Sequence, residues 1–441
     1  MRRNLSRGIA CAAVLLSVLL SGALLHGKPL PAAQKPPVFD VITVSAAITP
    51  PIAAYILQSI DEAAGSGAEG LIVRLDTPGG LDLAMRDIAK GILNAPVPVI
   101  VYVSPSGARA ASAGVIITIA AHLAAMAPGT NIGAAHPVGI GIGGQMDKTM
   151  SEKVENDAVA YVRGIAGQRG RNADWVEKAV RKSESITAEE ALRLKVIDFV
   201  TTDMNQLLAQ VEGREVTLAA GKKGLRTKGA VLNEKAMGMR LKVLSALSNP
   251  NIAYILLLIG LAGLYFELSN PGAIFPGVIG GISLIMAFFA MQTLPVNYAG
   301  VALILFSIIL FIAEIMVVSH GLLTVGGIIS LVIGSLMLFE SPDPALRISL
   351  GVLVPAVVLT SLFFVVIIAF ALKSQFRRKL GGKEGMVGVQ GRAVSDVFKE
   401  GTVLIQGEYW SAFSDAPLAR GTEVRVVQVE HLKVKVEAVE Q

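Results

Sequence analysis

A serine flanked on both sides by small residues has the setting of a nucleophile. Ser112 stands in the run Ala110-Ala111-Ser112-Ala113-Gly114, and an apolar segment follows it directly. A reactive serine at a junction between a strand and a helix needs small neighbours, because the backbone of a substrate must come close to it. The pattern therefore predicts a nucleophile at Ser112, followed by a backbone N–H, that of Ala113, for a developing oxyanion.

A second segment has the composition for the other half of an oxyanion hole. Leu75-Asp76-Thr77-Pro78-Gly79-Gly80 follows an apolar stretch that is typical of a strand. Two consecutive glycines allow a backbone N–H to point at a ligand oxygen. We expect Gly80 to be this donor, with Gly79 as the alternative. A simple turn is the other interpretation of this glycine pair.

A serine hydroxyl also needs a base. Two histidines lie near the serine in the sequence: His122 falls in an apolar segment typical of a packed side chain, and His136 stands in a turn before Pro137 and could approach the site. The alternative is a lysine whose pKa falls toward neutrality through burial or a neighbouring positive charge. Periodicity alone does not choose between Lys148 and Lys153.

Three motifs together resemble the membrane-bound NfeD family: DTPGG at 76–80, GARAASAG at 107–114 and MAPGTNIGAAHP at 126–137. The resemblance implies a protease domain similar to ClpP and to signal peptide peptidase A, and a Ser–Lys dyad. It implies Lys153 as the base, because residues 153–161, KVENDAVAY, resemble the family segment that carries it. Helical spacing puts Lys153 on one face with Asp157, so an ordinary surface ion pair is the alternative.

The rhythm of the chain predicts an α/β protease domain over residues 38–213. Strands at 38–44, 71–75 and 97–103 alternate with helices at 50–64 and 81–93, which indicates a largely parallel sheet covered on both faces. Both DTPGG and Ser112 come just after strands, where ligands of such sheets bind. Residues 139–145 are glycine-rich and indicate a mobile loop, 150–168 a helix and 196–200 a last strand.

The remaining segments predict an integral membrane protein of the cell inner membrane. Residues 1–27 have the basic start and apolar core of a signal peptide or anchor. A basic connector with an amphipathic helix follows at 214–249, and a transmembrane region of five spans at 250–373. Basic residues after the last span place the protease domain outside the cytoplasm and the C-terminus inside. Glu314, within the third span, favours a structural hydrogen-bonding role.

Residues 384–441 predict a small all-β barrel of the OB type. Five short strand patterns separated by turn residues fit this fold, and the family resemblance implies such a domain here. Tyr409 and Trp410 could form a stacking platform, but Trp410 in the core is the favoured interpretation. The barrel supports partner binding, which need not involve nucleic acid.

Composition narrows the function. The chain is 53% hydrophobic, has a formal net charge of +5 and contains a single cysteine, so neither nucleic acid, a cofactor nor a metal is expected. We expect a serine endopeptidase that cleaves apolar segments of stomatin-like membrane partners, the substrate that the resemblance implies, and that forms a homo-oligomer by analogy with ClpP. The alternatives are a non-catalytic membrane scaffold for such a partner, a Ser–His protease, and a crotonase-type acyl-CoA enzyme.

Overall fold

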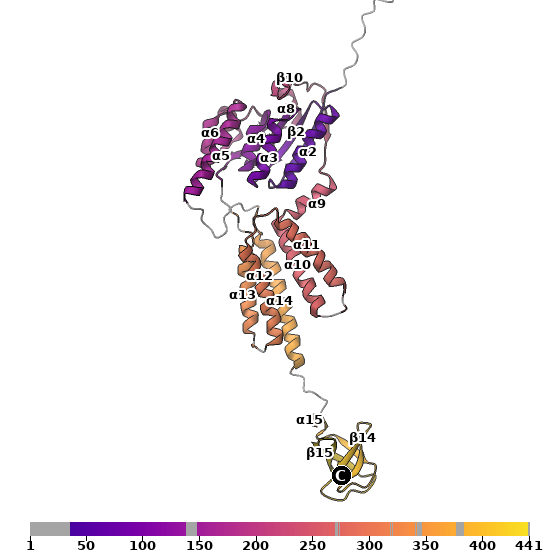
Figure 1. Cartoon of the computed structure of the whole chain (residues 1–441). Coiled ribbons are helices and arrows are strands. Elements are labelled where there is room, and N and C mark those ends of the chain that lie inside the picture. Colours follow the sequence, from indigo (N-terminus) through magenta and orange to yellow (C-terminus); the bar gives the residue numbers. More distant parts are fainter. Residues whose placement is uncertain are drawn as a thin grey trace, which may run out of the picture. The chain divides into compact units, whose positions relative to one another are not determined.

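The computed structural model describes residues 36–137, 148–269, 272, 274–317, 319, 321–339, 341, 346–375 and 383–439. The chain divides into two compact units, residues 1–304 with 331–356, and residues 305–330 with 357–441. Figure 1 labels its helices and strands along the chain. The expected signal at 1–27 and the expected loop at 139–145 lie outside the described residues.

The first unit contains a six-stranded sheet in the order β11-β1-β2-β3-β5-β8, in which every pairing is parallel. Its central strands are nearly continuous apolar runs, and β3 is buried at every position, as a sheet covered on both faces requires. The predicted parallel α/β fold is confirmed. The strands are β1 (Val38–Ser45), β2 (Gly70–Asp76), β3 (Val99–Val103), β5 (Leu123–Met126), β8 (Phe199–Val200) and β11 (Val231–Glu234).

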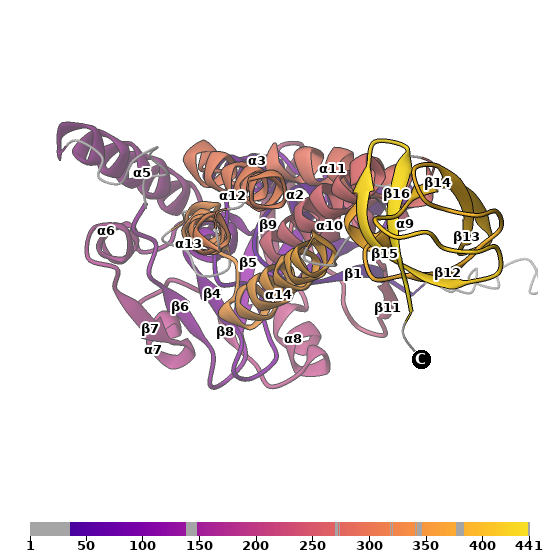
Figure 2. The ribbon, with the colours of Figure 1, turned by 90° about the horizontal axis from the view of Figure 1, so that it is seen from below.

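Helices cover both faces of this sheet (Figure 2). Because strand side chains alternate, Val73 and Leu75 join the larger apolar core with α2 (Pro50–Ser66), α3 (Asp82–Leu93) and α4 (Ala113–Ala120). Ile72 faces the other side, where Leu207 and Leu208 of α8 (Met204–Val211) pack. Alongside the larger core lie α5 (Lys148–Gln168), α6 (Ala173–Arg181) and α7 (Ala188–Arg193).

A small three-stranded sheet carries the serine segment. It consists of β4 (Arg109–Ala111), β6 (Asn131–Gly133) and β7 (Ser185–Thr187), in the order β4-β6-β7. β4 and β6 run parallel, with Ala111 opposite Gly133. This sheet directs the chain from β4 straight into α4, so Ser112 lies at the junction between a strand and a helix that its sequence predicts.

The α/β domain extends beyond the expected boundary at residue 213. The hairpin β9 (Glu215–Leu218) and β10 (Gly221–Gly224) is followed by β11, which is the edge strand beside β1. A helix is present at the end of this connector, α9 (Met239–Leu247), but its apolar side chains are not gathered on one face. Met237 and Leu241 pack against the larger core of the α/β domain. The α/β domain therefore covers part of the apolar surface of this connector that was expected to lie on the membrane.

Five apolar helices follow: α10 (Pro250–Ser269), α11 (Ile274–Met291), α12 (Tyr298–Met316), α13 (Leu322–Met337) and α14 (Leu350–Gln375). Within the described residues, α10 and α11 are long and apolar enough to cross a membrane, and the other three hold shorter apolar stretches. α10 and α11 pack closely through glycines, since a Cβ on Gly263 would lie only 2.7 Å from the Cα of Gly280.

Glu314, near the end of α12, has the structural role that its sequence context favours. Its carboxylate accepts hydrogen bonds from the hydroxyl of Ser319 at 2.6 Å and from the backbone N–H groups of Gly321 and Thr324, each at 3.0 Å. The last two donors lie at the start of α13, where helical N–H groups have no partner within the helix. Glu314 therefore joins α12 to α13 by capping the second helix.

The last domain is a closed barrel in the order β12-β13-β14-β16-β15, which confirms the predicted five-stranded fold. The first strand begins only at Gln390, after a short helix, α15 (Lys383–Met386). Trp410 packs against the barrel core, whereas Tyr409 is 72% exposed. The strands are β12 (Gln390–Ala393), β13 (Gly401–Ile405), β14 (Glu408–Phe413), β15 (Glu423–Glu430) and β16 (Lys433–Ala438).

Candidate active site

Ser112 has a strained backbone at the start of α4. Its φ of 52° and ψ of −112° lie in a region that side-chain-bearing residues seldom adopt. Its N–H donates to the carbonyl of Gly133 at 3.0 Å, which holds the strained turn in place. The serine is the N-cap of α4, yet its hydroxyl makes no capping hydrogen bond. The hydroxyl thus stays available in a half-buried position beside the positive end of a helix.

The loop after β2 is bonded directly to the strand that leads to Ser112. The N–H of Thr77 donates to the carbonyl of Arg109 at 2.8 Å, and the N–H of Ala111 donates back to the carbonyl of Thr77 at 3.1 Å. Asp76 accepts the N–H of Arg109 at 3.1 Å. The two segments that the sequence separates by more than thirty residues are therefore neighbours, as expected.

The hydrogen bonds around the glycine pair distinguish its two members. The N–H of Gly79 donates to Thr77 Oγ1 at 3.2 Å, so this donor is occupied. Ile48 hydrogen-bonds to the backbone on both sides of the N–H of Gly80. Its N–H donates to the carbonyl of Gly79, and its carbonyl accepts from the N–H of Leu81. Among the described residues the N–H of Gly80 has no partner. Of the two glycines, Gly80 therefore has the free donor.

The close approach of the two segments depends on small residues. A Cβ on Gly114 would lie 2.7 Å from Thr77 Cγ2 and 3.3 Å from the Cβ of Ala110. A Cβ on Gly80 would come within 2.5 Å of the nitrogen of Ile48 and closer still to its carbonyl oxygen. The glycines that the motifs contain are thus a packing requirement as well as a conformational one.

Two arginines hold the far end of α4. Arg169 donates to the carbonyl of Ala120 at 2.8 Å, and Arg171 donates to those of Ile119 and Ala121 at 3.1 and 3.2 Å. Arg171 is buried and also pairs with Asp198 at 2.9 Å. Cations at the carboxyl end of a helix satisfy its last carbonyls and favour its dipole. They fix the helix whose opposite end carries Ser112.

The structure does not bring Lys153 to Ser112. Lys153 is exposed on α5, whose buried side chains begin only at Val159, and no hydrogen bond or ion pair joins it to any described residue. The alternative of a Lys153–Asp157 ion pair is not observed either. Asp157 instead accepts from Arg86 of α3 at 2.6 Å. Lys148, the other candidate, is the exposed first residue of α5.

The histidines differ in their environment. Burial, and secondarily the charge of Arg169, lower the pKa of His122 to about 3, so this side chain is neutral. Its Nδ1 accepts the N–H of Val99 at 3.2 Å, as expected for a packed histidine. His136 is half-buried, and its Nδ1 lies 2.9 Å from the carbonyl of Val180. No hydrogen bond joins His136 to Ser112 in the part of the chain that the structure describes.

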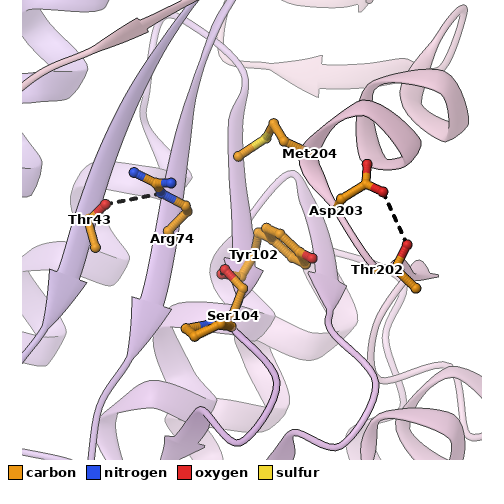
Figure 3. A pocket seen from close by; sticks show the side chains of 8 residues that line it. Thr43, Arg74, Tyr102, Ser104, Thr202, Asp203 and Met204 are labelled. Carbon is orange, nitrogen blue, oxygen red and sulfur yellow. Dashed lines mark hydrogen bonds between the residues drawn. The ribbon is translucent and has the colours of Figure 1, made fainter.

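A pocket of about 400 Å³ lies at the carboxyl ends of β1, β2 and β3 (Figure 3). Arg74 donates to Thr43 on one side of it, and Asp203 at the start of α8 lies on the other. Tyr102 belongs to the core that α8 covers, opposite the face on which α4 packs. The pocket does not include Ser112, Gly80 or Lys153. The pocket is lined by Thr43, Arg74, Tyr102, Ser104, Pro105, Thr202, Asp203 and Met204.

Sequence reasoning missed several residues that shape the site. The hydroxyl of Thr77 accepts the N–H of Gly79, the carbonyl of Gly133 accepts the N–H of Ser112, and Arg86 forms an ion pair with Asp157. Only Arg86 could have been noticed in the sequence, because it stands four residues after Asp82 on a predicted helix. The described residues contain no group of three or more His, Cys, Asp or Glu side chains suited to a metal ion.

Models of protein families match three separate parts of the chain. Residues 38–219 match the NfeD1b N-terminal domain, residues 251–370 the NfeD integral membrane domain, and residues 383–437 the NfeD-like C-terminal, partner-binding domain. The membrane-bound protease PH1510 of Pyrococcus horikoshii is 34% identical over 379 residues, which cover 83% of this chain and 85% of the relative.

The chain belongs to the NfeD family. It is an integral membrane protein and a homologue of a membrane-bound protease. The membrane protein NfeD1b of Bacillus subtilis is 27% identical over 445 residues, covering 96% of each chain. A solved structure of the 1510-N membrane protease specific for a stomatin homolog, from Pyrococcus horikoshii, is 33% identical, with a TM-score of 0.42, and covers 48% of this chain and 98% of its own.

Proposed function

We propose that this NfeD chain is a membrane-anchored serine endopeptidase that uses Ser112 as nucleophile and Lys153 as general base. The observation that carries the proposal is the junction at Ser112, where a strained serine with an uncommitted hydroxyl starts a helix. The homologous membrane-bound protease supports this choice over a crotonase-type enzyme. The resemblance in residues 153–161 supports Lys153.

In this mechanism the neutral amine of Lys153 takes the proton of Ser112 Oγ while Oγ attacks the scissile carbonyl. The N–H groups of Gly80 and Ala113 stabilise the oxyanion, and the free N–H of Gly80 supports it over Gly79. The lysine then gives its proton to the leaving amine, and water hydrolyses the acyl-enzyme. Because Lys153 is exposed in the single chain, the mechanism requires the N-terminal part of α5 to approach Ser112 when substrate binds or when chains assemble.

The proposed substrate is an apolar segment of a stomatin-like membrane protein. A solved relative is described as specific for a stomatin homolog, and the C-terminal barrel matches a partner-binding domain. We assign the barrel to binding this partner and the α/β domain to cleaving it. The α/β domain would lie outside the cytoplasm and the barrel inside, as the basic residues after the last apolar helix indicate.

The test is steady-state hydrolysis of a fluorogenic apolar peptide by the full chain in detergent. Ser112→Ala and Lys153→Ala should each abolish turnover with unchanged thermal unfolding, and the double variant should be no worse, because residues of one catalytic unit lose activity non-additively. Activity should rise as the pH is raised above neutrality. If Lys153→Ala keeps most activity while His136→Ala loses it, and the rise occurs near pH 6.5, which is about the usual pKa of histidine, then a Ser–His mechanism replaces the dyad.

A further inference from the structure

One arginine connects the segment after the oxyanion loop to the helix of Lys153. Arg86 lies on α3, which begins two residues after Gly80. Its Nε donates to Asp82 of the same helix at 2.8 Å, and its Nη2 donates to Asp157 of α5 at 2.6 Å. Its guanidinium also lies over the ring of Tyr161, 4.5 Å from the centroid. One side chain thus makes an intrahelical ion pair, an interhelical ion pair and a cation–π contact.

These contacts are on the face of α5 that carries Lys153. Positions 153, 157 and 161 follow one another at intervals of four residues, which places them along one side of a helix. Arg86 contacts the residues at the second and third of these positions, Asp157 and Tyr161. The first, Lys153, is left exposed and without an ion-pair partner among the described residues.

The same ion pair keeps a carboxylate away from Lys153. An acid four residues from a lysine on a helix ordinarily pairs with it and stabilises the charged ammonium. Here Asp157 is taken by Arg86 of α3. The neighbouring acid Glu155 is taken by Arg181 of α6, at 2.7 Å. A base must be neutral to accept a proton, so this arrangement suits a catalytic lysine.

We propose that Arg86 is a positioning residue of the protease site, which ties α5 to α3 beside the oxyanion loop and withholds Asp157 from Lys153. This inference rests on the proposed Ser112–Lys153 mechanism. Arg86 itself remains a cation throughout, since its bonds to Asp157 and Asp82 raise its pKa even though partial burial acts to lower it. The apposed helix α4 carries no titratable side chain. Besides Arg86, Lys153 and Asp157, the charged residues of α3, α5 and α6 are Asp82, Asp87, Lys90, Lys148, Glu152, Glu155, Arg163, Asp174, Glu177, Lys178 and Arg181.

The experiment measures kcat, KM and the pH profile of peptide hydrolysis by the full chain in detergent. Arg86→Ala should lower kcat about tenfold with little change in KM, because the base is held less well. It should also move the activity rise about 0.3 pH unit upward, since Asp157 becomes free to pair with Lys153 at the strength of an exposed helical pair. Adding Asp157→Asn should return the pH profile to that of the wild type, although kcat stays low.

Two further variants separate this role from a purely structural one. Arg86→Lys keeps a cation opposite Asp157 and should keep the wild-type pH profile. Arg163→Ala is the matched control, because Arg163 of α5 pairs with Asp174 and Glu177 of α6 and with nothing on α3. It should leave kcat and the pH profile unchanged.

The inference is overturned if Arg86→Ala leaves the pH profile in place, whether or not it lowers the melting temperature. It is also overturned if the added Asp157→Asn does not reverse the shift. Should Arg86→Ala fail to fold, an unchanged profile is still expected for Arg86→Lys, and an upward shift in that variant counts against the inference. If Ser112→Ala or Lys153→Ala retains turnover, the proposed function has failed instead, which is a separate result.

Discussion

Replacement of Gly80 by alanine tests the oxyanion hole most sharply. The φ of Gly80 is +154°, and a Cβ there would come within 2.5 Å of the nitrogen of Ile48. The atoms that this Cβ would meet, the nitrogen and the carbonyl oxygen of Ile48, belong to the backbone and cannot turn aside. The parallel bridge between Ile48 and Gly80 must therefore open. Movement of this loop would take the N–H of Gly80 away from the oxyanion hole that we propose it forms with the N–H of Ala113.

The magnitude follows from the loss of one oxyanion donor, which lowers kcat by about 10²- to 10³-fold, or roughly 3–4 kcal/mol of transition-state stabilisation. KM should change little, because the interaction strengthens only in the transition state. Thr77→Val offers a milder variant. It removes the oxygen that accepts the N–H of Gly79 and should lower kcat about tenfold by loosening the same loop.

The assay is peptide hydrolysis by the full chain, with thermal unfolding measured on the same preparations. Gly129→Ala is the control, since Gly129 also has a positive φ, +74°, but has open space around its Cβ position. It should reduce stability by roughly 1 kcal/mol and leave kcat near the wild-type value. A folded Gly80→Ala variant with wild-type kcat would refute the assignment of Gly80 to the oxyanion hole.

Three other predictions concern the scaffold and the topology. The α/β domain should lose about 2 kcal/mol of unfolding free energy between pH 7.5 and pH 5, because His122 is protonated below pH 6.5 in the unfolded chain whereas its folded pKa is about 3. Unfolding is followed by the fluorescence of the buried Trp175 in a Trp410→Phe background. His122→Asn should make the unfolding free energy less dependent on pH. Arg171→Met should cost about 3 kcal/mol in the same assay, because it removes the donor to three buried carbonyls and the cation that pairs with Asp198, and a loss below 1 kcal/mol would contradict the helix clamp. Protease treatment of cells whose outer membrane has been opened should digest residues 38–213 and spare 384–441, and protection of both would contradict the proposed orientation.

Periodicity predicted the fold where apolar patterns are long. The helices at 50–64 and 81–93 agree with α2 and α3 to within two residues, and the five short strand patterns expected over 384–441 agree with the five strands of the barrel. These segments fix their own structure because burial of one face decides it. The edge strand β11 was missed, since VLNE has only two apolar residues and is a strand only because β1 pairs with it.

The candidate site was predicted in its local parts only. Small residues around Ser112 and the glycine pair indicated that the two segments would meet, and bonds between Thr77 and Arg109 join them. The choice between Gly79 and Gly80 depends on a side-chain oxygen of Thr77, which no sequence pattern shows. The surroundings of Lys153 likewise depend on Arg86, a residue of another helix, so they follow from tertiary packing alone.

The most direct test of the central claim is covalent labelling of the full chain with a fluorophosphonate, followed by peptide mapping. The account predicts a single labelled residue, Ser112, no labelling of Ser112→Ala, and labelling of Lys153→Ala that is slower by orders of magnitude, because the serine has lost its base. Labelling of Lys153→Ala at the wild-type rate would contradict the dyad. Peptide hydrolysis by Ser112→Ala, or by wild-type protein that the fluorophosphonate fails to label at Ser112, would contradict the assignment of Ser112 as the nucleophile.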